Sequence, residues 1–415
     1  MGAGSKHNPE VWITGLGLVS SLGDGIGAHR TLLAEEKCRP NVDQSSFAPY
    51  PVHPLVDIEF STQIKRKSDM RQMGIWQQIG VYAAGLALGD AGLHGQQDLL
   101  VSTELIVAAG NGERDVSADR AVLAALEGAS GRDGDCSSVL NNALQTTLRP
   151  TLYLSELSNL LAGNISIIHG VTGSSRTYKG EEMAGVSAVR DAVCRIAAGQ
   201  GELFLVGGAF NGARTDLMLN YELCSALWHG QHRSVWQRKS EGGGFILGSL
   251  GAFLVVEAAS HARARGRKPY AKITAITSGQ GKQFTREFSS HSSSDVLLDE
   301  LRAALPSGPL AVLSGASGVE AATQRELVWL DALDSRGIAP AVRAYGTLLG
   351  HSVEAQFPTG IALAALAVSE GQLFKPFDDS GRERPFDAPM ERILVTGWGH
   401  WRGTGLAVVE PAAMH

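Results

Sequence analysis

One stretch of the chain, residues 173–185, predicts a strand, a tight turn and a helix in immediate succession. Residues 176–178 lie between glycines and include a β-branched and an aromatic side chain, which favours a strand. Valine and isoleucine then recur at helical spacing over residues 186–196. In acyl-transfer enzymes such an elbow holds a Cys or Ser, whose anion is stabilised by the helix dipole and by unpaired amides. Here the turn carries Glu181 and Glu182, so the sequence predicts an elbow without its nucleophile.

The rest of the chain alternates apolar strand patterns with helical ones, in two successive halves. We expect crossover helices to join the strands, which gives an α/β fold with mixed, largely parallel sheets covered by helices. A basic segment at residues 261–268 suggests a boundary, so we assign the halves to residues 10–258 and 259–412. The expected strands are 11–19, 105–109, 176–178, 202–209, 244–257, 271–277, 310–313, 393–399 and 405–409. The expected helices are 75–93, 186–196, 295–304, 320–333 and 358–369.

The first strand ends in a glycine pair, Gly15 and Gly17, that could be mistaken for a dinucleotide-binding fingerprint. It lacks the third glycine and the acidic residue that closes such a unit, so we do not expect it to bind a nucleotide. A similar strand followed by a GxG motif returns at residues 393–399, which suggests a duplicated unit.

Composition excludes several classes of partner. The formal net charge of −6 argues against nucleic acid, because neutralising phosphates requires a basic face. No stretch has the roughly 20 uninterrupted apolar residues that a spanning helix needs, and the N-terminus does not read as a signal peptide. We therefore expect no membrane partner and a cytoplasmic location. The four cysteines form no CxxC pair, so no metal and no disulfide framework is expected, and no cofactor is implied.

Two of the cysteines allow a functional and a structural interpretation. Cys194 or Cys224 could serve as a displaced nucleophile, although Cys194 lies about three helical turns beyond the elbow. The alternative is that they are small buried apolar residues, as free cysteines commonly are.

Taken together, these segments resemble the β-ketoacyl synthases of fatty acid and polyketide synthesis. The resemblance covers residues 11–409 and is most specific over residues 11–23, 170–185, 244–272 and 350–365. It implies a thiolase-like α/β fold, in which duplicated βαβ halves form a layered αβαβα sandwich.

The resemblance also shows where this chain departs from the family's catalytic set. Glu182 stands at the Cys of the T-A-C-x-S/A-G elbow, and Ala316 stands at the His of the N-A-H-G-T run. In the K-S-x-x-G-H motif, Gly346 replaces the Lys and only His351 remains. Decarboxylative condensation needs an acylated nucleophile and two hydrogen-bond donors for the enolate. This chain keeps at most one of those donors, so we expect no activity from the chain alone.

The glycine-rich loop near the C-terminus has gained bulk. The family's G-F-G-G-T-N gating loop corresponds here to Gly399, His400, Trp401 and the three residues after them. We expect this loop to obstruct the pocket as a plug, or to form a recognition surface. Structural alternatives stand for the other positions: Glu181 and Glu182 favour a helix N-terminus whatever the site does, and His351 is equally a hydrogen-bonded core residue.

In keeping the fold and losing the Cys, this chain resembles the chain-length factors, which are the inactive halves of type II ketosynthase heterodimers. This implies a catalytic ketosynthase and acyl carrier protein as partners, in polyketide or aryl-polyene synthesis. Four residues of the expected interface strand, Arg176, Thr177, Tyr178 and Lys179, would then line or seal the shared tunnel.

Two alternatives remain open at this point. One is a malonyl-carrier decarboxylase or acyltransferase that uses Glu182 and His351 as acid and base. The other is a structural homodimer that only binds acyl carriers.

Overall fold

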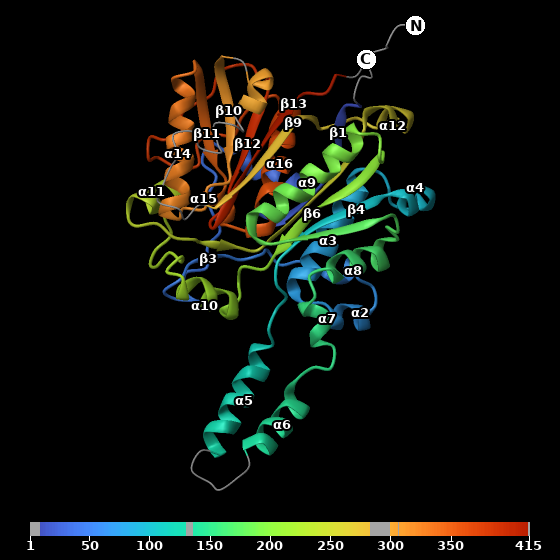
Figure 1. The fold of residues 1–415 in the computed structure, drawn as a ribbon, viewed down its shortest axis with the longest axis vertical. Coiled ribbons are helices and arrows are strands. Elements are labelled where there is room, and N and C mark those ends of the chain that lie inside the picture. Colours follow the sequence, from blue (N-terminus) through green and yellow to red (C-terminus); the bar gives the residue numbers. More distant parts are fainter. Residues whose placement is uncertain (1–8, 130–135, 283–298, 306, 414–415) are drawn as a thin grey trace.

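The computed structural model describes residues 9–129, 136–282, 299–305 and 307–413. They form a layered α/β body from which one pair of helices projects (Figure 1). The main sheet has two sections with the same connectivity. The first section runs β5-β4-β6-β8-β1 and the second runs β11-β10-β12-β13-β9. Numbered within its own section, each has the strand order 3-2-4-5-1.

The strands have the following bounds. In the first section they are β1 (Val11–Ser20), β4 (Glu104–Ala109), β5 (Ser175–Lys179), β6 (Leu203–Phe210) and β8 (Leu250–Ala258). In the second they are β9 (Ala271–Lys282), β10 (Gly308–Ser314), β11 (Ile338–Ala344), β12 (Ile393–Trp398) and β13 (Arg402–Glu410). Short strands are β2 (Gly23–Asp24), which pairs with β1, and β3 (Val52–His53), which pairs with β7 (Leu247–Gly248). The duplication suggested by the repeated strand patterns is therefore present in the fold, while the boundary at residue 258 stays a prediction.

The strand directions agree with the expected mixed, largely parallel arrangement, because four of the five strands in each section run in one direction. The outer pairs are parallel: β4 pairs with β5 and with β6, and β10 pairs with β11 and with β12. The central pairs are antiparallel, including the short β1–β9 pairing that joins the two sections. The antiparallel pairs within the sections arise because β8 and β13 each run against the other four strands of their section, and β13 returns from β12 through the short loop 399–401.

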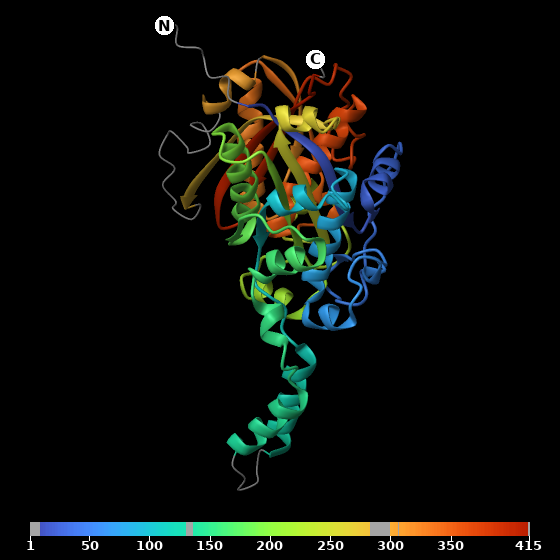
Figure 2. The same ribbon diagram turned by 90° about the vertical axis from the view of Figure 1, so that its right-hand side faces the viewer.

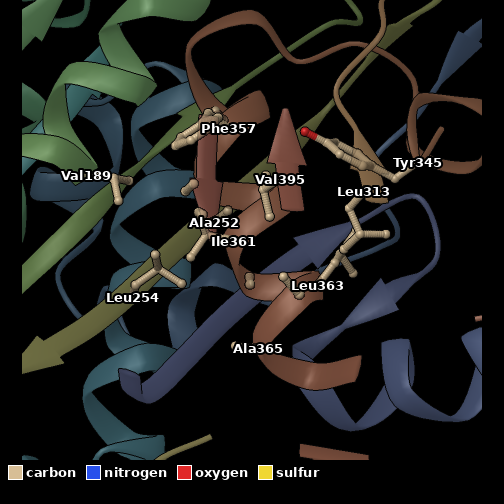
Figure 3. Close-up of a cluster of buried hydrophobic side chains, with 14 of the residues drawn as sticks. Val189, Ala252, Leu254, Leu313, Tyr345, Phe357, Ile361, Leu363, Ala365 and Val395 are labelled. Atoms are coloured by element: carbon tan, nitrogen blue, oxygen red, sulfur yellow. The ribbon is translucent and has the colours of Figure 1, made fainter. Parts of the chain in front are cut away.

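Helices lie between and outside the two sections, as the thiolase-like sandwich requires. α9 (Glu181–Ala197) and α16 (Gln356–Glu370) pack on each other and on both sections, while α3 (Ile75–Asp90) covers the first section and α14 (Glu320–Asp334) covers the second. Figure 3 shows side chains of α9, α16, β8 and β12 meeting in the central layer. The layered αβαβα fold is confirmed.

The remaining helices lie around the body, apart from α5 and α6, the pair that projects from it (Figure 1). They are α1 (Gly25–Leu33), α2 (Lys67–Gln72), α4 (Gln97–Ser102), α5 (Val116–Ala129), α6 (Cys136–Thr147), α7 (Leu152–Glu156) and α8 (Leu160–His169) in the first half of the chain. α10 (Thr215–Leu223), α11 (Val235–Ser240), α12 (Ala259–Ala264) and α15 (Gly346–Leu349) follow, with 3-10 turns η1 (Phe60–Thr62), η2 (Arg302–Ala304) and η3 (Val353–Ala355). The first four residues of the helix expected at 295–304 lie outside the described residues, and its last three form η2.

The glycine pair of β1 serves helix packing. A Cβ on Gly15 would lie 2.5 Å from the Ala87 carbonyl oxygen, and one on Gly17 would lie 2.0 Å from that of Ala83. Both carbonyls belong to α3, which can approach β1 this closely only because the two positions carry no side chain. This accounts for the GxG motif without a nucleotide.

Candidate functional site

The elbow forms as the sequence predicts, and its backbone is strained. β5 ends at Lys179, Gly180 turns with a φ of 118°, and Glu181 begins α9 with a φ of 53°. A residue other than glycine rarely adopts this left-handed conformation, which costs of order 1–3 kcal/mol. The second residue of the helix, Glu182, is buried with 3% of its surface exposed.

Glu182 and His351 are hydrogen-bonded to each other inside the protein. The Nε2 atom of His351 lies 2.8 Å from Oε1 of Glu182, and His351 is only 1% exposed. Burial alone would raise the pKa of Glu182, but the hydrogen bond and the charge of His351 outweigh it and hold the pKa below its usual value. The elbow therefore carries a carboxylate that is already bonded to the imidazole beside it.

The imidazole of His351 is fixed by backbone and ring contacts. Its amide donates to the Ile246 carbonyl at 2.8 Å, and its carbonyl accepts from the Gly248 amide at 3.1 Å. Its ring stacks on Phe245 with centroids 4.9 Å apart. The backbone bonds fix the position of His351, and turning its ring toward another partner would break the stacking on Phe245 and the hydrogen bond to Glu182.

The gating loop closes over the same aromatic ring. His400 is 9% exposed, with its ring 4.8 Å from that of Phe245 and 4.1 Å from that of Trp401. Burial lowers the pKa of His400 to about 4, so the ring is neutral near pH 7. Two residues after His400, Arg402 reaches Glu181 at 3.5 Å. Whether this loop acts as a plug or as a recognition surface stays a prediction.

The two positions that lost their functional side chains lie side by side. Ala316 is buried in an apolar cluster with Val235 and Trp398. Gly346 begins α15, and a Cβ on it would lie 3.1 Å from the Ala316 carbonyl oxygen and 3.4 Å from Val235. Packing against neighbouring residues occupies this side of the site, and neither position offers a donor side chain.

The residues expected at a subunit interface lie on an open sheet edge. β5 is last in the strand order and pairs only with β4 among the described strands. Arg176 is exposed and forms an ion pair with Asp191 at 3.0 Å, while Thr177 and Tyr178 are half-buried. Lys179 lies at the wall of a pocket beside the elbow.

That pocket, of about 280 Å³, contains a residue that sequence reasoning missed. Glu354 lies at its wall with Tyr221, Cys224 and Trp401. Burial first, and then the charges of Glu182 and Glu181, raise the pKa of Glu354 to about 7. The available signal was its place three residues after His351, in the one family motif that keeps its histidine.

Neither cysteine considered earlier fits the expectation of burial. Cys194 and Cys224 are both exposed free thiols, Cys194 on α9 and Cys224 at the pocket beside the elbow. Within the described ranges, no group of three or more His, Cys, Asp or Glu side chains is placed to hold a metal ion. No helix in the same part of the chain is long and apolar enough to cross a bilayer.

Comparisons with known proteins agree with the fold and the elbow. Residues 8–262 match the family described as Beta-ketoacyl synthase, N-terminal domain. The 3-oxoacyl-acyl-carrier-protein synthase 2 of Vibrio harveyi is 26% identical over 272 residues, which are 63% of this chain and 61% of that protein. Its counterpart in Rhizobium meliloti (strain 1021) is 26% identical over 279 residues, 63% of this chain and 62% of that protein. The chain thus spans about three fifths of the length of these relatives.

Solved structures extend the likeness to the whole fold. The ishigamide ketosynthase/chain length factor has a TM-score of 0.77 at 19% identity, covering 98% of this chain and 100% of that one. A type II polyketide synthase acyl carrier protein in complex with its ketosynthase bound to the hexaketide gives a TM-score of 0.75 at 16% identity, with coverages of 98% and 100%. Because the family match spans more than half of the chain and includes the elbow, this chain belongs to the β-ketoacyl synthase family.

Proposed function

We propose that this chain is the non-catalytic subunit of a ketosynthase heterodimer, comparable to a chain-length factor. It would pair with an active ketosynthase and shape the tunnel in which that partner extends an acyl chain held on acyl carrier protein. The observation that carries the proposal is the buried Glu182–His351 pair at the elbow. A carboxylate is a poor acceptor for a thioester-borne acyl group, and its hydrogen bond to His351 already engages the Nε2 atom of that imidazole.

The other positions of the site support the same function. Ala316 and Gly346 supply no donor, and the loop that carries His400 and Trp401 packs against Phe245. The open edge of β5 offers a surface on which a second chain of this fold could extend the sheet. Two similar structures contain a ketosynthase/chain length factor and a carrier protein bound to its ketosynthase, which are the two partner classes that we infer here.

The first test concerns acyl transfer and assembly. Incubated with acyl carrier protein charged with labelled malonyl or acetyl groups, the purified chain should gain no mass by intact-protein mass spectrometry. Co-expressed with an active type II ketosynthase from the same genome, the chain should elute as a one-to-one complex, and the label should appear on the ketosynthase. A covalent acyl adduct on this chain would contradict the proposal.

A second function is favoured by one observation, the 2.8 Å contact between a carboxylate and an imidazole. Such a pair could act as acid and base in a decarboxylase or acyltransferase. The lowered pKa of Glu182 argues against decarboxylation, since a carboxylate held in the ionised form would repel the enolate left by loss of CO₂.

Replacing Glu182 by Gln separates the two functions. A working acid/base pair should lose about 10²-fold or more in the rate of malonyl-carrier decarboxylation, measured by release of labelled CO₂. A non-catalytic subunit shows no turnover in either form. Glu181→Gln, one residue away, is the matched control and should change neither result. Decarboxylation by the wild-type chain that Glu182→Gln abolishes would establish the enzyme and refute the non-catalytic subunit.

A further inference from the structure

The pocket beside the elbow, with a volume of about 280 Å³, is a part of the site that the proposed function does not use. It lies at the end of the body from which α5 and α6 project, as the course of the chain leaving β4 shows in Figures 1 and 2. A cavity of this size suits a small molecule. The side chains at its wall therefore decide what chemistry it can receive.

Four aromatic side chains from four separate parts of the chain line the pocket. Trp76 lies in the first turn of α3, Phe210 ends β6, Tyr221 lies on α10 and Trp401 lies in the loop between β12 and β13. Trp76 and Phe210 are 3% and 7% exposed, so the core holds these two rings in place. The faces of aromatic rings attract cations, and rings gathered around a cavity are the usual way in which proteins recognise ammonium ions.

A buried carboxyl group belongs to the same wall. Glu354 is 7% exposed, and its carboxyl lies against Gly110, since a Cβ there would be 2.6 Å from Oε1 and 3.0 Å from Oε2. The nearby charges of Glu182 and Glu181 have the same sign as its own, and no cation of the described residues forms an ion pair with it. A buried carboxylate normally has a positive partner, and here a ligand could supply it.

The cationic side chains around the pocket are engaged elsewhere or lie in water. Arg214 at the wall is paired with Asp216 at 2.5 Å. Arg402 reaches Glu181 at 3.5 Å. Lys179 is exposed to solvent, which screens its charge. The part of the pocket at Glu354 therefore keeps a negative character.

Tyr221 shows that α10 faces the same acidic group. Burial first, and then the charges of Glu354, Glu182 and Glu181, raise the pKa of its hydroxyl well above the ordinary value. Tyr221 thus remains neutral at any physiological pH, and its ring stands opposite the carboxyl groups. A cation between them would touch an aromatic ring on one side and a carboxylate on the other.

An apolar chain would fit this pocket poorly. Its wall also includes the amides of Asn111, Asn211 and Asn220. A hydrocarbon that entered would take water from these groups and from Glu354 without replacing the lost hydrogen bonds. An ammonium ion carries apolar groups for the rings and a charge for the carboxylate.

We propose that this pocket binds a small organic cation of the ammonium class, with its charged nitrogen beside Glu354 and its alkyl groups against Trp76, Tyr221 and Trp401. The wall described above comes from this chain alone, so the inference goes beyond the proposed heterodimer and does not rest on it.

The test compares two probes of the same shape. Choline carries a permanent charge on nitrogen, and 3,3-dimethylbutan-1-ol has a neutral carbon in the place of that nitrogen. In NMR titrations of the full chain at pH 8, choline should bind at least about tenfold more tightly than its neutral analogue.

The pH dependence identifies the carboxylate that receives the charge. The pKa of Glu354 is about 7, so its ionised fraction rises from about a tenth at pH 6 to about nine tenths at pH 8. Choline itself does not titrate, so its dissociation constant should be about tenfold higher at pH 6 than at pH 8. Of the groups that face Glu354, Glu182 stays ionised and Tyr221 stays neutral over this range. Glu181→Gln should keep the difference between the two pH values, which excludes the remaining carboxyl group as its source.

Glu354→Gln should raise the dissociation constant of choline at pH 8 by at least about tenfold and remove its pH dependence. The matched control is Glu222→Gln on α10, which is bonded to His229 at 3.0 Å and lies outside the pocket wall. It should change the dissociation constant by less than about twofold. Circular dichroism should be the same for the wild type and both variants.

Three results would overturn the inference: no binding of choline at either pH, equal binding of the neutral analogue, or unchanged binding by a folded Glu354→Gln variant. If Glu354→Gln does not fold, the comparison of the two probes at pH 6 and pH 8 on the wild type decides alone. None of these results bears on the proposed subunit role, which the acyl-transfer and assembly experiment tests separately.

Discussion

Replacing Glu182 by Ala should lower the free energy of unfolding by roughly 3–5 kcal/mol, because it leaves a buried imidazole without its partner. The Nε2 atom of His351 loses an acceptor at 2.8 Å and gains no water in its place, since both residues are buried. Denaturant unfolding followed by tryptophan fluorescence measures the difference.

Two variants make this measurement specific. Glu182→Gln keeps an acceptor of the same shape and should cost less than Glu182→Ala. Glu181→Ala removes the neighbouring carboxylate, which is partly exposed and paired with Arg402 at 3.5 Å, so its cost should stay within about 1 kcal/mol. Equal costs for Glu181→Ala and Glu182→Ala would show that the buried pair contributes nothing special.

The same pair predicts a direction for the pH dependence of stability. The pKa of Glu182 is lower in the folded chain than its ordinary 4.5, so its contribution is complete above about pH 4.5 and is lost as the pH falls through the folded value. His400 acts in the same direction over a higher range. Its folded pKa of about 4 lies below its ordinary 6.5, so the unfolded chain binds a proton first as the pH falls below 6.5. The contributions of Glu182 and His400 to stability should therefore decrease from pH 6.5 downward, while that of Glu354 changes in the opposite direction, and His400→Phe should remove the His400 contribution above pH 4.5.

Gly17→Ala should prevent the chain from reaching its folded state in normal yield. The added Cβ would lie 2.0 Å from the Ala83 carbonyl oxygen and 2.6 Å from the Ala87 amide nitrogen. Both are backbone atoms of α3, so relief requires the helix to move away from the central strand, at an expected cost of about 3 kcal/mol or more. Soluble yield and the urea midpoint are the measurements.

Gly27→Ala is the matched control for this substitution. Gly27 lies within α1, and a Cβ placed on it meets nothing within 4 Å. Removing a helical glycine should stabilise the chain by about 0.5–1 kcal/mol. A Gly17→Ala protein as stable as the wild type would show that β1 and α3 are less closely packed than described.

The sequence predicted the elbow and the main strands because each depends on a local pattern. Residues 176–178 and the helix beginning at Glu181 appear where glycine spacing and helical periodicity place them. The antiparallel pairs at the centre of the sheet were not assigned from the sequence, although one signal was present. Only three residues separate β12 from β13, a gap that allows a hairpin and no crossover helix.

The partners of the site residues depend on contacts between distant parts of the chain. The spacing of Glu182 and His351 along the chain does not indicate that they bond. Neither does the sequence around His351 and His400 indicate that the rings of these two histidines both contact Phe245. Glu354 was missed because its buried position comes from α9 and the end of β4, which are remote in sequence.

The bond between Glu182 and His351 spans 169 positions and connects the first sheet section to the second. An enzyme needs some conformational freedom at a contact of this kind between its two halves, because substrate must enter and product must leave there on every cycle. A subunit that releases no product is spared that requirement. In the non-catalytic subunit proposed above, this bond would hold the two halves of the chain together throughout, so that the cavity of a neighbouring subunit keeps constant dimensions.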